Sequence, residues 1–159
     1  MLALNDIKTR LTEIQAAITG VKKAFIDSPP SLAEADLPLF LNFTGPATTD
    51  YAMYGDGEAL QTRDYLMRMY VTPVQAGESG EAEKAVEALI PAIYGAFFAR
   101  PGLSGTAMGH TAPLAGIREA TIISDTGVSV FTFAGAQYLG TEFKIRVNEE
   151  ISFTYATGE

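Results

Sequence analysis

The sequence predicts an α+β fold, a mostly antiparallel β-sheet with two helices packed on one face, in a single domain over residues 1–159. Two segments carry apolar residues at the three-and-four spacing of an amphipathic helix. Several others alternate apolar and polar residues or are short apolar runs bounded by turns, as strands are. The two helices have the only apolar stripes available to cover the sheet.

The first helix is expected from an apolar stripe near the start of the chain. Its members are Leu4, Ile7, Leu11, Ile14 and Ile18. Asn5 or Asp6 is expected to cap the helix and Gly20 to end it. The outer face is expected to consist of the polar residues Lys8, Arg10, Thr12 and Glu13.

Two short strands are expected next, at residues 21–26 and 37–43, with Pro38 marking a strand start or a sheet edge. Residues 44–57 contain Gly and Pro and are expected to form a long loop, and an extended hairpin that docks on a neighbouring molecule is the alternative. This loop carries Tyr51, Met53 and Tyr54.

Residues 61–74 alternate cleanly and predict a long strand with one buried face. The buried face is expected to contain Tyr65, Met67, Met69 and Val71. The partly solvated face is expected to contain Asp64, Leu66, Arg68 and Tyr70.

A helix is expected at residues 81–98, kinked by Pro91 because proline removes an interior hydrogen bond. A loop with the only histidine should follow over 101–116. Strands are then expected at 117–124, 128–133, 137–147 and 151–156. Turns at Asp125-Thr126-Gly127 and at Glu149-Glu150 would make them a meander of hairpins.

The composition excludes several classes of protein. The chain has no Cys, so it has no disulfide and no thiolate metal site. A net charge of −8 gives a surface that repels nucleic acid on average. We expect no signal peptide and no membrane span.

Asp125-Thr126-Gly127 also matches the three-residue signature of aspartic peptidases, in which two carboxylates share one proton. A homodimer would supply both carboxylates. The competing interpretation is a hairpin turn, because these residue types favour turns. Ser124 stands where the peptidase pattern has an apolar residue, which favours the turn.

Other polar residues predict no site. Ser79 and Ser104 lack the full spacing of a nucleophile elbow, and His110 would be their only base. His110 is expected to be solvated, since one histidine makes no zinc site. The carboxylates Asp50, Asp56 and Glu58 lack calcium-loop spacing. No phosphate or dinucleotide motif is present, so no cofactor is expected. A weaker hypothesis is a small-molecule site in loop 44–58.

The remaining candidates are residues for subunit contacts. Lys144 and Arg146 share one strand face by period two, while Arg63 and Arg68 lie in the strand 61–74. These cations are suited to pair with acidic residues of another subunit, and a solvated strand face is the alternative interpretation. The full set is Tyr51, Met53, Tyr54, Arg63, Arg68, Tyr70, Lys144 and Arg146.

The order of these elements resembles the tail terminator, or tail completion, proteins of long-tailed bacteriophages. The best local parts are Thr62-Arg63-Asp64-Tyr65-Leu66-Met67-Arg68-Met69-Tyr70-Val71 and Tyr138-Leu139-Gly140-Thr141-Glu142-Phe143. The resemblance is one of plan over most of the chain, without a diagnostic motif. Head–tail connector and tail tube proteins are similar small acidic ring formers and remain alternatives.

The resemblance implies a structural protein of the virion, made in the bacterial host cytoplasm, without enzymatic activity. Such proteins form a homohexameric ring at the head–tail junction. The ring caps the tail tube protein and presents a surface to the head–tail connector. DNA would pass through the channel without specific binding, and an acidic lining would suit that passage.

Overall fold

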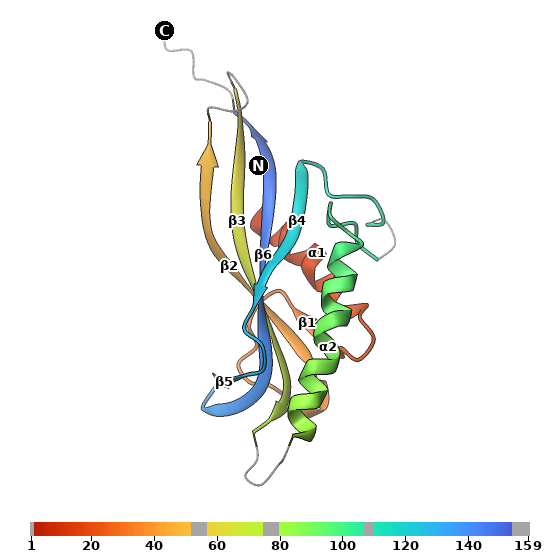
Figure 1. Cartoon of the computed structure of the whole chain (residues 1–159). Helices are drawn as coiled ribbons and strands as arrows, with labels where there is room; N and C mark the ends of the chain where they lie inside the picture. Colours follow the sequence, from red (N-terminus) through yellow and green to blue (C-terminus); the bar gives the residue numbers. More distant parts are fainter. Residues whose placement is uncertain (1, 52–56, 75–79, 107–109, 154–159) are drawn as a thin grey trace.

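The computed structural model describes residues 2–51, 57–74, 80–106 and 110–153. Figure 1 shows a long twisted sheet with both helices on one side of it. The elements are α1 (Leu4–Ala16), β1 (Lys23–Phe25), the 3₁₀ helix η1 (Glu34–Asp36), β2 (Leu39–Asp50), β3 (Glu58–Pro73), α2 (Glu81–Phe98), β4 (Ile117–Asp125), β5 (Ser129–Phe133) and β6 (Ala136–Ser152). The predicted α+β fold is confirmed.

The sheet has six strands in the order β1-β2-β3-β6-β4, with β5 also paired to β6. All pairs are antiparallel except β1 with β2. β3 and β6 form the spine of the sheet, since they pair from Glu58 with Ser152 to Pro73 with Tyr138.

The main core lies between the helices and one face of the sheet. The predicted buried face of β3 is confirmed, with Tyr65, Met67 and Met69 fully buried. α2 runs unbroken through Pro91 and buries Val86, Ile93 and Phe97. Burying a side chain of this size contributes about 1.5–3 kcal/mol, so this layer holds the helices in place.

α1 is buried on two sides, which differs from the expected polar outer face. Arg10 and Thr12 are buried, and the loop after α2 packs against Arg10, which donates to its carbonyls. The expected caps at Asn5 and Asp6 are also wrong, since Ala3 is the N-cap and makes no side-chain bond. Instead, the backbone N–H of Leu2 donates to the carboxylate of Glu149, 147 positions away.

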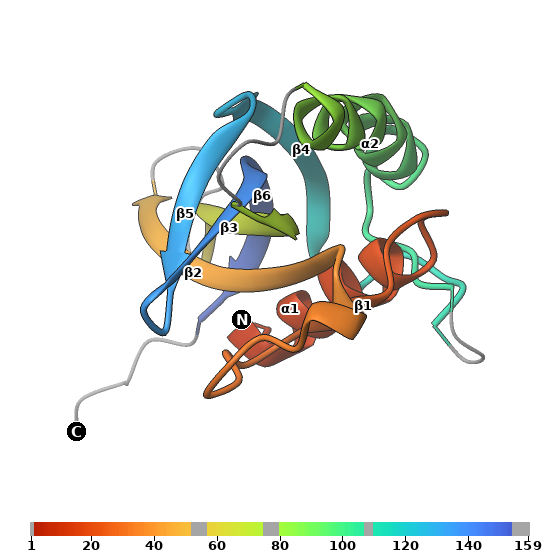
Figure 2. The same cartoon turned by 90° about the horizontal axis from the view of Figure 1, so that it is seen from below.

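A second, smaller core lies on the other face of the sheet. It contains Leu37, Leu39, Leu41, Tyr70 and Tyr138. Tyr70 packs edge-on against Phe131, Phe133 and Tyr138, with ring centroids 5.6–6.0 Å apart. Figure 2 shows the cause, because β5 folds across this end of the sheet. Tyr70 is fully buried, so its expected place on a partly solvated contact face is wrong.

The expected long loop at 44–57 is strand up to Asp50, and its antiparallel pairing with β3 agrees with the alternative of an extended hairpin. β2 continues beside β3, and a register shift between Thr44 and Ala47 absorbs Gly45 and Pro46. The bulge accommodates Gly45 and Pro46, which weaken a regular ladder of hydrogen bonds between strands. Pro38 precedes β2, as expected for a strand start.

The expected turn at Glu149-Glu150 is also wrong, because β6 runs straight through it to Ser152. Both residues pair with β3, opposite Gln61 and Leu60. Glu149 is buried and accepts a hydrogen bond from the backbone of Leu2. A residue type that is usually solvated is therefore part of the sheet here.

β4 and β5 do not form the expected hairpin. Asp125 lies opposite Phe143, and Ser129 lies opposite Gly140, so the two strands follow each other along one edge of β6. Between them, Thr126 exchanges two hydrogen bonds with the backbone of Glu142, both 3.0 Å long. Asp125-Thr126-Gly127 is therefore a break within an edge strand.

A buried amide pair joins α1 to the sheet. Gln15 and Asn42 exchange hydrogen bonds of 2.7 and 2.9 Å, and Asn42 also donates to the carbonyl of Phe25 at 3.0 Å. Asn42→Ala is expected to lower the free energy of unfolding by about 2 kcal/mol, since it leaves the Gln15 amide buried without its partner.

Urea denaturation measures this loss. The double variant Gln15→Leu/Asn42→Leu is the control, because removing both polar partners is expected to cost less than removing one. A single variant that is as stable as the wild type would contradict the structural role of the pair.

Candidate functional site

The sheet face opposite the helices carries a ladder of paired polar side chains along β3 and β6. Arg146 donates to both oxygens of Asp64, at 2.9 and 3.2 Å. These bonds raise the pKa of Arg146 above its ordinary value. Thr62 bonds Asn148 at 2.9 Å. Lys144 lies half-buried in the same row, opposite Leu66. Arg146 and Lys144 thus lie on one face, as expected.

Arg68 is held within its own chain. Its Nε donates to Glu142 at 2.7 Å, and its guanidinium lies 5.1 Å from the Phe43 ring and 4.8 Å from the Phe131 ring. A cation held between two rings and a carboxylate stabilises the fold. Its side chain is 28% exposed, which leaves little of it for a second subunit.

Two other candidates differ in how accessible they are. Arg63 is half-buried and donates to the carbonyl of Gly45 at 2.9 Å, so it supports the β2 bulge. Tyr51 is 60% exposed at the end of β2 and packs edge-on against Phe153. It remains a surface candidate. Met53 and Tyr54 lie outside the described residues.

Asp125 is exposed, and both its carboxylate oxygens accept hydrogen bonds within the chain. Oδ1 accepts from the backbone N–H of Gly127 at 2.8 Å, and Oδ2 accepts from the hydroxyl of Tyr94 at 2.7 Å. Burial and this bond raise the pKa of Tyr94 to about 12. These contacts give Asp125 a structural role in joining α2 to β4. The peptidase hypothesis still needs a second carboxylate from a partner molecule.

His110 is bonded rather than simply solvated. Its Nδ1 pairs with Oε1 of Glu13, and its carbonyl accepts from Arg10 at 2.6 Å. Gly105 lies against this group, where a Cβ would meet Glu13 Oε2 at 2.1 Å. Ser104 lies nearby in the chain, while Ser79 and Asp56 lie outside the described residues. The contacts show how α1 holds the loop, and they assemble no nucleophile–base pair.

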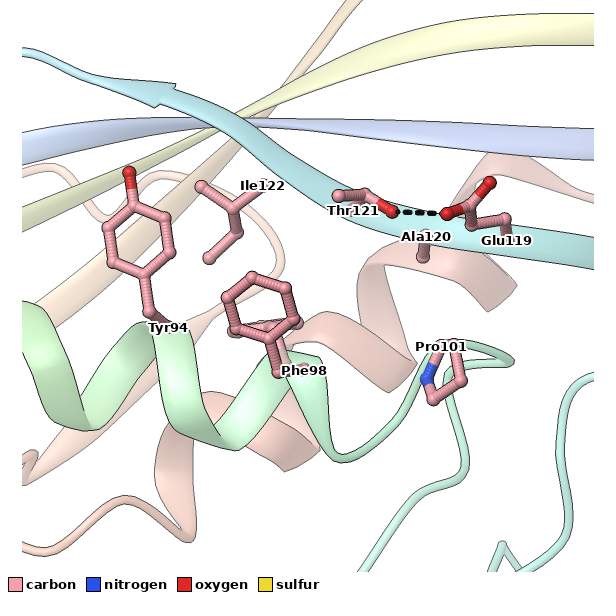
Figure 3. A pocket seen from close by; sticks show the side chains of 8 residues that line it. Tyr94, Phe98, Pro101, Glu119, Ala120, Thr121 and Ile122 are labelled. Atoms are coloured by element: carbon pink, nitrogen blue, oxygen red, sulfur yellow. Dashed lines mark hydrogen bonds between the residues drawn. The ribbon is translucent and has the colours of Figure 1, made fainter.

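An apolar pocket of about 130 Å³ lies between the end of α2 and β4. Figure 3 shows Tyr94 and Phe98 on the helix side and Ala120 and Ile122 on the strand side, with Pro101 at one end. Phe98 is 71% exposed beside it. Such apolar exposure next to a hollow is typical of a contact surface.

No candidate metal centre occurs in the described part of the chain, where no three His, Cys, Asp or Glu residues gather. Among the same residues, no helix has the length and apolar character needed to cross a membrane.

Tyr65 gives the protein a predicted sensitivity to high pH. Its hydroxyl is buried without a hydrogen-bond partner among the described residues, and burial raises its pKa to about 12. The unfolded chain titrates near pH 10, so stability is expected to fall as the pH rises from about 10 to about 12. Urea denaturation between pH 8 and 11.5 measures the slope. Tyr65→Phe should lessen the slope, of which the raised pKa of Tyr94 leaves a part, and an unchanged slope would contradict the assignment.

The pocket and its exposed phenylalanine are missing from the sequence-based candidates. Phe97 and Phe98 are adjacent, and two successive residues of a helix cannot both face the sheet. Ile122 and Ile123 are adjacent in a strand, where successive side chains point to opposite faces, and Ile123 is 43% exposed. These doublets are the sequence pattern that predicts apolar surface here. Comparisons with protein-family models and with curated proteins found no match for this chain.

Proposed function

We propose that this protein is a structural ring former of a bacteriophage tail, most specifically a tail terminator that caps the tail tube. One observation carries the proposal: the sheet ends in two edge strands, β1 and β4, that lie at opposite ends of the strand order. A subunit with two different edges is suited to head-to-tail contacts. Such contacts close into a ring when the rotation between neighbours allows it.

The polar groups of the described residues support a structural role. Two cations of the open sheet face are paired within the chain, Arg146 with Asp64 and Arg68 with Glu142. Apolar surface remains instead at Tyr51 and Phe98, which are 60% and 71% exposed. Exposed aromatic residues are enriched where proteins bind one another. This distribution favours assembly over catalysis.

The resemblance in plan to tail terminators supplies the specific form of the proposal. In that role the ring stops growth of the tail tube and joins the tail to the head–tail connector. The net charge of −8 suits a channel through which DNA passes without binding. Other connector and tube proteins are also small acidic ring formers. Experiment therefore decides which position on the tail the protein occupies.

Electron microscopy of the purified chain tests ring formation. Rings of one size, alone or after addition of tail tubes, are the expected result. A protein that stays monomeric and ignores tail tubes would contradict the proposal. Growth assays then separate the positions, because a terminator stops tube elongation while a tube protein extends it.

A further inference from the structure

The hairpin of β5 and β6 exposes an edge strand that carries no charge. Residues 126–141 contain no acidic or basic residue and no Pro. Val130 is 53% exposed, and Thr132 is exposed on the same side of the strand. Among the described residues β5 pairs only with β6, so its other edge is open. Figure 1 places this hairpin near one end of the sheet.

The other edges of the sheet have features that hinder pairing with a strand of another molecule. Short length, charged side chains, proline and bulges all have this effect. β1 has only three residues and begins at Lys23, directly after Lys22. β4 carries the exposed carboxylates of Glu119 and Asp125, and a register shift at Pro46 interrupts β2. β5 has no charge, no proline and no register shift, and it consists mainly of residues that favour strands.

The backbone groups on the open edge of β5 belong to Val130 and Thr132. Thr132 lies opposite Gln137, whose carbonyl accepts from the N–H of Val74 on the far side, at 3.0 Å. Thr132 and Gln137 are therefore a non-hydrogen-bonded pair, in which the N–H and C=O of Thr132 point outward. The pattern alternates without a register shift, so those of Val130 point outward as well. No hydrogen bond from the described residues uses these groups.

We propose that β5 of one copy pairs with β5 of a second copy, antiparallel and about a two-fold axis between the two Phe131 residues. In this register Val130 of each copy lies opposite Thr132 of the other. Their outward N–H and C=O groups then meet as hydrogen-bonded pairs. The edge is thus complementary to itself, as a two-fold contact requires. Both opposed side chains are β-branched, a type that packs well across strands.

The charge of the chain favours a second copy at this edge over the other edges. With a net charge of −8, two copies repel each other on average and approach most easily through an uncharged surface. Self-pairing at β1 or at β4 would bring exposed lysines or exposed carboxylates of the two copies together. Like charges opposite each other destabilise strand pairs, and β5 has none.

The second core continues across the proposed pair. Phe131 lies on the face of β5 that covers this core, edge-on to Tyr70 with ring centroids 6.0 Å apart. It is only half-buried in the single chain. At the two-fold axis Phe131 lies opposite its copy in a non-hydrogen-bonded pair, in which side chains approach most closely. Each ring covers the other, and the second cores of the two molecules form one apolar layer.

The pairing goes beyond the proposed ring and does not depend on it, because a two-fold contact closes on itself. Sedimentation velocity of the full chain from about 10 μM to about 1 mM covers the weak affinity of a small contact. The wild type is expected to form a dimer. Val130→Lys/Thr132→Lys and Val130→Glu/Thr132→Glu each place like charges opposite each other, so each should weaken the dimer on the order of 10-fold or more.

An equimolar mixture of the lysine and glutamate variants is the decisive arm. Opposite charges then face each other across the pair, so the dimer should return. Ala85→Lys/Ala88→Lys makes the same change in net charge at exposed positions of α2 and should leave the dimer unchanged. Circular dichroism checks folding. If the lysine variant is impaired, Thr132→Pro replaces it, since proline removes the outward N–H and spares the bonds to β6.

Three results would each overturn pairing through β5. They are a wild type that stays monomeric at about 1 mM, a lysine variant that dimerises like the wild type, and a mixture that stays dissociated. The ring proposal stands or falls separately, because the capping of tail tubes tests it.

Discussion

Gly140→Ala is expected to lower the free energy of unfolding by about 3 kcal/mol. Gly140 lies in β6 where β3 passes closely, opposite Tyr70. A Cβ there would lie 1.8 Å from the carbonyl oxygen of Met69, an atom of the backbone that cannot move aside alone. The two spine strands would separate, and the second core around Tyr70 would loosen with them.

Gly95→Ala is the matched control for this prediction. Gly95 lies in α2 with nothing within 4 Å of its Cβ position, so alanine should stabilise the helix by about 0.5–1 kcal/mol. Thermal and urea denaturation measure both variants. Equal stabilities for Gly140→Ala and the wild type would contradict the close approach of β3 and β6.

Arg10→Met is expected to destabilise the protein by about 3 kcal/mol, because its charged hydrogen bonds are among the stronger ones. One nitrogen, Nη1, donates to the carbonyls of Leu103, His110 and Ala112, at 3.3, 2.6 and 2.9 Å. Met keeps most of the apolar stem but cannot donate. The loop after α2 would then lose these three attachments to α1 and keep the contact of His110 with Glu13.

Hydrogen exchange of the loop amides measures this effect directly. The amide of Gly105, which donates to His110, should exchange faster in Arg10→Met than in the wild type. Lys8→Met removes a neighbouring cation of α1 that donates to the carbonyl of Ile26, at the end of β1, and should leave the loop protected. Equal exchange in both variants would contradict the role of Arg10.

The sequence predicted the regular elements well where periodicity alone decides them. The alternation of β3 and the apolar stripe of α2 are local patterns, and both helices and the buried face of β3 are confirmed. The errors arose where tertiary contacts override local preference. Gly45 and Pro46 predict a loop, yet they lie in a bulge within β2, which pairs with β3 on both sides of them.

Burial of polar residues was the harder part of the prediction. Arg10 and Glu149 are residue types that usually face solvent, and both are buried because distant backbone groups satisfy them. The pairing of β4 and β5 along one edge was likewise unpredictable, since it depends on the register of β6. Of the candidate contact residues, the structure buries Tyr70, binds Arg68 within the chain and leaves Tyr51 exposed.

Electron microscopy of tail tubes incubated with the purified protein tests whether the protein caps the tube as a ring. We expect one ring at a tube end, and tubes that no longer elongate when more tube protein is added. Bare tube ends and unchanged elongation at saturating protein would contradict a role as tail terminator.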